Sequence, residues 1–189
     1  MQRLALVEQR LARFLDADVQ VWHGRVENGV ADSRPLLRRL RRWLGRSGVS
    51  HSVRCAQSDH SLTHAGQSMF ALAVKASNIS GVGIDFEPWR ALDQRHQRLM
   101  LTARESVALG AASARDLLRI WTVKEACFKA DVLGQQRWVT AYALDNPAQK
   151  SGGARVTCGR LVHRFRYISL EVPGGMLSVA FKMGELGHE

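Results

Sequence analysis

The order in which helical and strand-like patterns follow one another restricts the fold of this chain more than any other feature. Segments that predict strands dominate the last third of the sequence. They span residues 137–144, 154–158, 164–172 and 176–182. Pro173-Gly174-Gly175 predicts a hairpin turn between the last two segments. Because helical patterns precede this region, the sequence predicts an α+β fold with mostly antiparallel sheets.

The first half of the chain mixes both periodicities. Apolar residues recur at helical spacing in two segments, the second of which begins at Pro35 and ends at Gly45. Nearly continuous apolar runs elsewhere predict buried strands. We expect helices at residues 3–15 and 35–45, strands at 19–22, 68–75 and 81–87, a turn at 78–81 and a loop at 46–60.

Two capping boxes predict further helices in the second half. Thr102 with Glu105, and Ser113 with Asp116, each place a hydroxyl three positions before a carboxylate. In this arrangement each side chain accepts a hydrogen bond from the other residue's backbone N–H. The first box predicts a short helix, and the second predicts a longer one that ends at about Ala130.

Length and charge limit the kinds of partner. The 189 residues suffice for one domain or two small packed halves. A net charge of +10 suits nucleic acid, an anionic membrane, a polyphosphate ligand or an acidic protein, and also a generally basic soluble protein. No stretch approaches the ~18 uncharged apolar residues of a membrane helix. No nucleic-acid motif is recognisable. We therefore expect no membrane and no nucleic acid as partners.

The N-terminus and the cysteines indicate a compartment. Residues 1–15 carry Glu8 and several arginines through their apolar part, so they predict an amphipathic helix and not a signal peptide. The cysteines, Cys55, Cys127 and Cys158, are odd in number and share no metal-type spacing. Reduced thiols in the cytoplasm fit this pattern.

A pair of carboxylates lies on the predicted strand GVGIDFE. Side chains alternate along a strand, so Asp85 and Glu87 share one face, about 7 Å apart, opposite Val82, Ile84 and Phe86. Two like charges on one strand face repel each other unless a cation lies between them. A hard divalent cation with oxygen ligands is one interpretation. A solvent-facing polar side of the strand is the other.

The predicted helix over residues 113–130 carries charges inside its apolar arc. Lys124 and Glu125 fall within that arc, and Lys129 falls at its edge. An i,i+4 ion pair between Glu125 and Lys129 would stabilise the helix by only a few tenths of a kcal/mol, about 0.2–0.5. One carboxylate for a metal and two ammonium groups for phosphate explain the placement better, as a metal–diphosphate site.

These residues resemble a known family. Gly83-Ile84-Asp85-Phe86-Glu87 and the segment Trp121 to Lys129, WTVKEACFK, are similar to the two signature motifs of the 4′-phosphopantetheinyl transferases. Ser61-Leu62-Thr63-His64-Ala65-Gly66 resembles a third family segment that precedes a strand. The layout resembles the larger, surfactin-type members. That resemblance implies two similar α/β halves in one chain, residues 1–88 and 89–189, related by a pseudo-twofold axis with the site between them.

The resemblance implies roles around a metal. Asp85, Glu87 and Glu125 would bind Mg²⁺, or Mn²⁺, at the diphosphate of coenzyme A. Glu125, directly or through a water, would take the proton from the acceptor serine. Lys129 would assist at the phosphates. Glu105 would be a further catalytic or metal-binding carboxylate, although the capping box with Thr102 already explains this residue.

The resemblance also implies contacts to coenzyme A, which would be the substrate. Lys124 and Lys129 would pair with its phosphates, His64 would contact phosphate, and Thr63 the 3′-phosphate region. Apart from the resemblance, a lone histidine before a strand is more often an ordinary surface or capped residue. Further cationic candidates for the nucleotide are Arg38, Arg42 and Arg54. The arginine-rich helix face, residues 38–42, would reach the 3′-phosphate, dock a partner, or simply be solvated. The usual Gly-(Arg/Lys)-Pro segment is missing from residues 48–60.

The implied activity is a 4′-phosphopantetheinyl transferase of the holo-carrier-protein synthase type. Its partner would be an acidic apo acyl or peptidyl carrier protein, which a basic surface would steer into place. A non-catalytic homologue that binds coenzyme A or a carrier protein is the alternative. With both halves in one chain, a monomer is expected.

Overall fold

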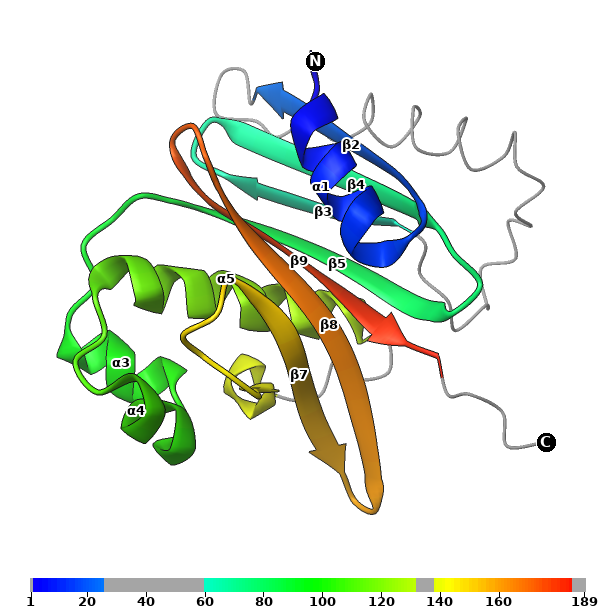
Figure 1. Cartoon of the computed structure of the whole chain (residues 1–189). Helices are drawn as coiled ribbons and strands as arrows, with labels where there is room; N and C mark the ends of the chain where they lie inside the picture. Colours follow the sequence, from blue (N-terminus) through cyan, green and yellow to red (C-terminus); the bar gives the residue numbers. More distant parts are fainter. Residues whose placement is uncertain (1, 26–59, 132–137, 185–189) are drawn as a thin grey trace.

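The computed structural model describes residues 2–25, 60–131 and 138–184 (Figure 1). It is an α+β fold whose strands form two antiparallel sheets, as the sequence predicts. The helix expected at 35–45 lies outside the described residues, as do nearly all of the predicted loop and the side chains of Arg38, Arg42 and Arg54.

The first sheet has four strands in the order β1-β2-β4-β3. They are β1 (Gln2–Arg3), β2 (Asp18–Arg25), β4 (Ser68–Lys75) and β3 (His60–Ala65). The amphipathic helix α1 (Ala5–Leu15) packs beside β2, as Figure 1 shows. Sequence analysis did not predict β3, because its polar residues carry no strand pattern. This strand forms the edge of the sheet.

The second sheet has five strands in the order β5-β9-β8-β7-β6. They are β5 (Ile79–Pro88), β9 (Gly175–Met183), β8 (Leu161–Val172), β7 (Ser151–Cys158) and β6 (Ala143–Leu144). The hairpin predicted at Pro173-Gly174 joins β8 to β9, and Gly174 has the positive φ of 89° that such a turn favours. β5 begins at Ile79, inside the predicted turn.

The predicted strand over 137–144 is wrong for most of its length. Val139–Ala141 form a short 3₁₀ helix (η1), and only Ala143–Leu144 pair as a strand. Tyr142 is fully buried between them, and its hydroxyl donates to Asp131 at the end of α5 (Ala114–Ala130). The strand-like composition of this segment therefore reflects burial of the tyrosine and not a ladder of hydrogen bonds.

Three helices follow β5. Both predicted capping boxes form, at the starts of α4 (Ala103–Leu109) and α5. A further helix, α3 (Gln94–Met100), was not predicted, and Asp93 caps it. No helix in the described part of the chain is long and apolar enough to cross a membrane.

The second sheet is covered on both faces. Val82, Ile84 and Phe86 of β5 belong to a core shared with α1 and the first sheet. On the other face, α5 lies across β5 and β9 (Figure 1). Asp85 lies on this face, because its carboxylate meets Lys129 of α5. The predicted separation of apolar and acidic faces is therefore confirmed.

Two glycines let α5 approach β5 closely. A Cβ at Gly83 would lie within 2.7 Å of the Ala130 backbone nitrogen and closer still to the Ala126 carbonyl oxygen. A Cβ at Gly81 would collide with the Ala130 carbonyl oxygen. Close approach of the two backbones requires glycine here, and it brings the side chains of α5 to the acidic residues of β5.

The proposed halves, residues 1–88 and 89–189, remain a prediction. β5 of the first half pairs along its length with β9 of the second.

Candidate active site

The site forms where the edge of the first sheet meets β5. Ser61 and Thr63 project from β3 toward that strand. The Ser61 Oγ accepts a hydrogen bond from the backbone N–H of Ile84 at 3.1 Å. The Thr63 hydroxyl donates to Asp85 Oδ1, also at 3.1 Å. Two motifs that are 22 residues apart in sequence are thereby in direct contact.

Lys129 closes this junction from α5. Its ammonium lies 2.7 Å from Asp85 Oδ1 and 3.2 Å from both the Thr63 hydroxyl and the Ile84 carbonyl oxygen. An ammonium group has three N–H donors, and here each has an acceptor. Lys129 therefore forms its ion pair with Asp85 across the site. The i,i+4 alternative with Glu125 does not form in the described structure.

Asp85 is almost completely buried, with 8% of its side chain exposed. Its Oδ1 accepts from Thr63 and Lys129. Its Oδ2 is buried and has no hydrogen-bond partner within the described residues. A buried carboxylate oxygen without a partner costs free energy, so it indicates that something else satisfies this atom. A hard cation is one group that would.

Glu87 and Glu125 lie beside Asp85, each half-buried. Burial raises the pKa of Glu125, and the negative charges of Asp85 and Glu87 raise it further, against the opposing effect of Lys129. Burial also raises the pKa of Glu87, and Asp85 adds to this, while Arg90 and a hydrogen bond from Trp121 lower it. The neighbouring carboxylates thus disfavour the charged forms of Glu87 and Glu125.

These carboxylates are a suitable donor set for Mg²⁺ or Mn²⁺, which prefer oxygen ligands. Among residues 2–25, 60–131 and 138–184, however, no three such side chains are gathered closely enough to hold a metal. Glu87 turns toward Arg90 instead, with 3.4 Å between Oε2 and the guanidinium. Mutual repulsion explains this spacing, because carboxylates converge only when a cation offsets their charge. The orphaned Oδ2 and the chemistry of the donor set therefore fit a metal.

Residues 81–173 match the sequence model of the 4′-phosphopantetheinyl transferase superfamily. This transferase match contains Asp85 and Glu87 on β5 and Glu125 and Lys129 on α5, and it leaves out Thr63 on β3. No curated protein matches the chain. The name of this superfamily indicates transfer of a phosphopantetheine group in general.

Lys124, five residues before the end of the WTVKEACFK segment, does not lie in this junction. It is fully buried, and its ammonium pairs at 2.7 Å with Glu105, which is itself 1% exposed. Burial lowers the pKa of Lys124, and the Glu105 carboxylate opposes that shift. In this conformation the ammonium forms an internal ion pair and does not face the junction. The expected contact between Lys124 and phosphate remains a prediction.

Glu105 fulfils the capping interpretation. Its Oε2 accepts from the backbone N–H and hydroxyl of Thr102 as well as from Lys124, and its Oε1 accepts from the backbone N–H of Leu144. This carboxylate joins α4, α5 and β6 and faces away from solvent. Both oxygens are thus hydrogen-bonded within the protein, and the capping box explains this carboxylate without a metal or a substrate. A catalytic or metal-binding role for Glu105 remains a prediction.

His64 is exposed, whereas its neighbour Thr63 is buried, because adjacent residues of a strand face opposite ways. His64 therefore remains available to a ligand but does not join Asp85 and Lys129.

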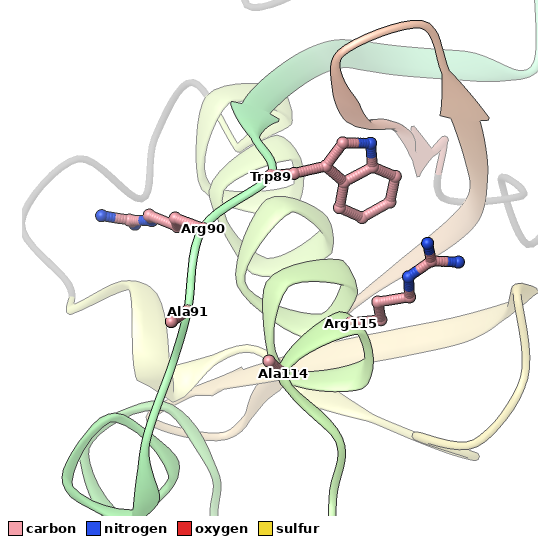
Figure 2. Close-up of a pocket in the computed structure, with 5 residues that line it drawn as sticks. All are labelled: Trp89, Arg90, Ala91, Ala114 and Arg115. Atoms are coloured by element: carbon pink, nitrogen blue, oxygen red, sulfur yellow. The ribbon is translucent and has the colours of Figure 1, made fainter.

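Sequence analysis missed a small open pocket beyond the end of β5. Its volume is about 360 Å³, and Trp89, Arg90, Ala91, Ala114 and Arg115 line it. Figure 2 shows the Trp89 and Arg115 side chains on the same side, with Arg90 pointing the other way. The Arg115 guanidinium lies 5.0 Å from the centre of the indole ring. The only hint of this pocket in the sequence is the pair Trp89-Arg90, which begins two positions after Glu87.

Proposed function

We propose that this protein transfers the 4′-phosphopantetheine arm of coenzyme A to a serine of an acidic apo acyl or peptidyl carrier protein. Mg²⁺, or Mn²⁺, would assist, and adenosine 3′,5′-bisphosphate would be released. The observation that carries this proposal is the Asp85–Lys129 ion pair, with the orphaned Asp85 oxygen, inside the transferase match. The reduced thiols of Cys127 and Cys158 suit the cytoplasm.

Asp85, Glu87 and Glu125 would hold the metal. When bound, the metal neutralises negative charge on a diphosphate and on its leaving group. Asp85 offers Oδ2 without losing any hydrogen bond, because Thr63 and Lys129 bind only Oδ1. Glu87 and Glu125 would have to turn toward that oxygen to complete the set, and their mutual repulsion would be offset by the charge of a bound cation.

Lys129 would contribute a fixed positive charge to the diphosphate. Each of its three N–H donors already has an acceptor. A phosphate oxygen would therefore bind Lys129 by replacing one of them, and the Ile84 carbonyl oxygen at 3.2 Å is the natural contact to exchange. His64, exposed on β3, and Arg38, Arg42 and Arg54 remain our proposed contacts to phosphate and nucleotide.

Glu125 is our proposed base. The serine O–H proton passes to its carboxylate, directly or through a water, and the serine oxygen forms a bond to the β-phosphorus. The bond from that phosphorus to the bridging oxygen breaks, and the electron pair leaves with adenosine 3′,5′-bisphosphate. A carboxylate beside the reacting atoms can accept this proton as a general base.

The acceptor protein would dock beside Glu87. The pocket of Trp89 and Arg115 opens there and presents an aromatic face next to a guanidinium. Together with the net charge of +10, it suits an acidic partner, whose association such a surface accelerates.

The experiment is incubation with coenzyme A, Mg²⁺ and a panel of apo carrier proteins, read by intact mass. We expect a gain of one phosphopantetheine group on the carrier, and no gain on a carrier whose acceptor serine is alanine. Binding of coenzyme A without any gain across the panel would instead support the non-catalytic alternative.

A further inference from the structure

Thr63 lies in an unexpected place for a residue that contacts a nucleotide. It is 6% exposed on the edge strand β3, and its hydroxyl lies inside the junction of the two sheets. The hydroxyl donates to Asp85 Oδ1 at 3.1 Å and accepts from the Lys129 ammonium at 3.2 Å. Its single donor is thus used, and one of its acceptor positions is filled.

These two bonds fix the orientation of the Asp85 carboxylate. Thr63 and Lys129 both bind Oδ1, and they approach it from different elements, β3 and α5. A carboxylate held by two donors on one oxygen cannot rotate freely, so Oδ2 stays directed at the place where it has no partner. The same threonine oxygen also holds the ammonium of Lys129 in place.

We infer that Thr63 is a positioning residue for the site. It orients the metal-binding oxygen of Asp85 and the ammonium of Lys129, and it does not contact the 3′-phosphate of coenzyme A. Thr63 itself lies outside the segment that matches the transferase superfamily, because that segment begins at residue 81. The inference rests on the metal site of the proposed function, and its kinetic consequences rest on the proposed transfer reaction as well.

The chain provides a matched control in Ser61. This residue precedes Thr63 by two positions on the same strand, and its hydroxyl also bonds across the junction. Its partner is the backbone N–H of Ile84, however, and not a side chain of the site. Ser61→Ala therefore removes a hydrogen bond between the sheets and leaves the bonds to Asp85 and Lys129 intact.

The first measurement is Mn²⁺ binding to the protein alone, by titration with electron paramagnetic resonance of the free ion. We expect Thr63→Val to weaken binding about tenfold or more, the usual effect of losing a hydrogen bond to a metal ligand. Thr63→Ser keeps the hydroxyl and should restore affinity to within about threefold, while Ser61→Ala should match the wild type. Unchanged Mn²⁺ affinity in folded Thr63→Val would overturn the inference.

The second measurement compares coenzyme A with 3′-dephospho-coenzyme A as substrates. A positioning residue affects both substrates equally, so the ratio of their kcat/KM values in Thr63→Val should equal that of the wild type. A nucleotide contact predicts the opposite, since loss of the contact would reduce the preference for the 3′-phosphate. A reduced preference would therefore overturn the inference.

The outcomes separate this inference from the proposed function. Mn²⁺ binding that depends on Thr63 in a protein without transferase activity would support the positioning role and reject the proposed reaction. Absence of Mn²⁺ binding in the wild type would reject both the positioning role and the proposed metal. If Thr63→Val does not fold, Thr63→Ala carries the same expectation, because it removes the hydroxyl without adding a methyl group near the charged atoms.

Discussion

Helix α5 carries two lysine–carboxylate pairs of equal length and different consequence. Lys124 meets Glu105 and Lys129 meets Asp85, each at 2.7 Å. The first pair is 0% and 1% exposed, and the second is 29% and 8% exposed. Glu105 has both oxygens occupied, whereas Asp85 has one oxygen without a partner.

This difference teaches that an ion pair on this helix indicates a functional site only when its carboxylate still has an oxygen without a hydrogen-bond partner. The Lys124 pair is closed and joins three elements, so we assign it to the stability of the fold. The Lys129 pair lies at the junction of two sheets, next to two carboxylates of raised pKa, and we assign it to the chemistry.

Lys124→Met should give the largest effect on stability. It leaves the Glu105 carboxylate buried without its cation, which costs about 3–5 kcal/mol of unfolding free energy. Urea denaturation measures this loss. The double variant Glu105→Gln/Lys124→Met is the control, since replacing both charges should recover most of the stability. A single variant as stable as the wild type would contradict the assignment to the fold.

Lys129→Met should show the opposite profile. We expect kcat/KM for transfer to fall about a hundredfold or more, the effect of removing a group that stabilises transition-state charge. The unfolding free energy should fall by less than in Lys124→Met, because the lysine of this pair is partly exposed to solvent. Loss of stability without loss of transfer would reverse the roles that we give to the two lysines.

Gly83→Ala tests whether the approach of α5 to β5 creates the second pair. The added methyl group collides with backbone atoms of Ala126 and Ala130, so we expect a loss of about 1–3 kcal/mol from overpacking. Mn²⁺ affinity should fall as well, because α5 carries Glu125 and Lys129 away from Asp85. In Gly152→Ala, the control on β7, the nearest atom is a Tyr167 hydroxyl at 3.5 Å, and neither property should change.

The smallest effect concerns pH. Burial and neighbouring charges raise the pKa of both Glu87 and Glu125, so the folded state binds their protons more tightly than the unfolded state does. Without metal, this contribution to stability is complete below the usual pKa of these groups and is lost as the pH rises through the raised values. Mg²⁺ should stabilise increasingly over the same interval, because it binds the deprotonated form.

Thermal unfolding as a function of pH, with and without Mg²⁺, measures this dependence. Glu87→Gln/Glu125→Gln should remove both trends. A wild-type midpoint that responds to Mg²⁺ equally at all pH values would argue against carboxylate ligands.

Local patterns predicted much of the fold and half of the site. Alternation along GVGIDFE gave the acidic face of β5, and spacing alone gave both capping boxes, because each depends on neighbours within one element. The helical arc showed that Lys124 and Glu125 both occupy costly positions.

The rest depended on contacts between distant segments. Nothing in the sequence shows that Lys124 meets Glu105, 19 residues away on another helix, or that Lys129 meets Asp85 at a separation of 44. The edge strand β3 is too polar to show a strand pattern. The contact between Thr63 and Asp85 could therefore be found only from the structure, which places β3 beside β5. The strand predicted over residues 137–144 was wrong for most of its length, because a segment that buries Tyr142 has the same apolar composition as a strand.

The most direct measurement of the central claim is anomalous diffraction from crystals grown with coenzyme A and Mn²⁺. We predict one strong anomalous peak per chain, bound by Asp85, Glu87 and Glu125 and adjacent to the diphosphate. A peak at any other position, or none with coenzyme A bound, would contradict the account.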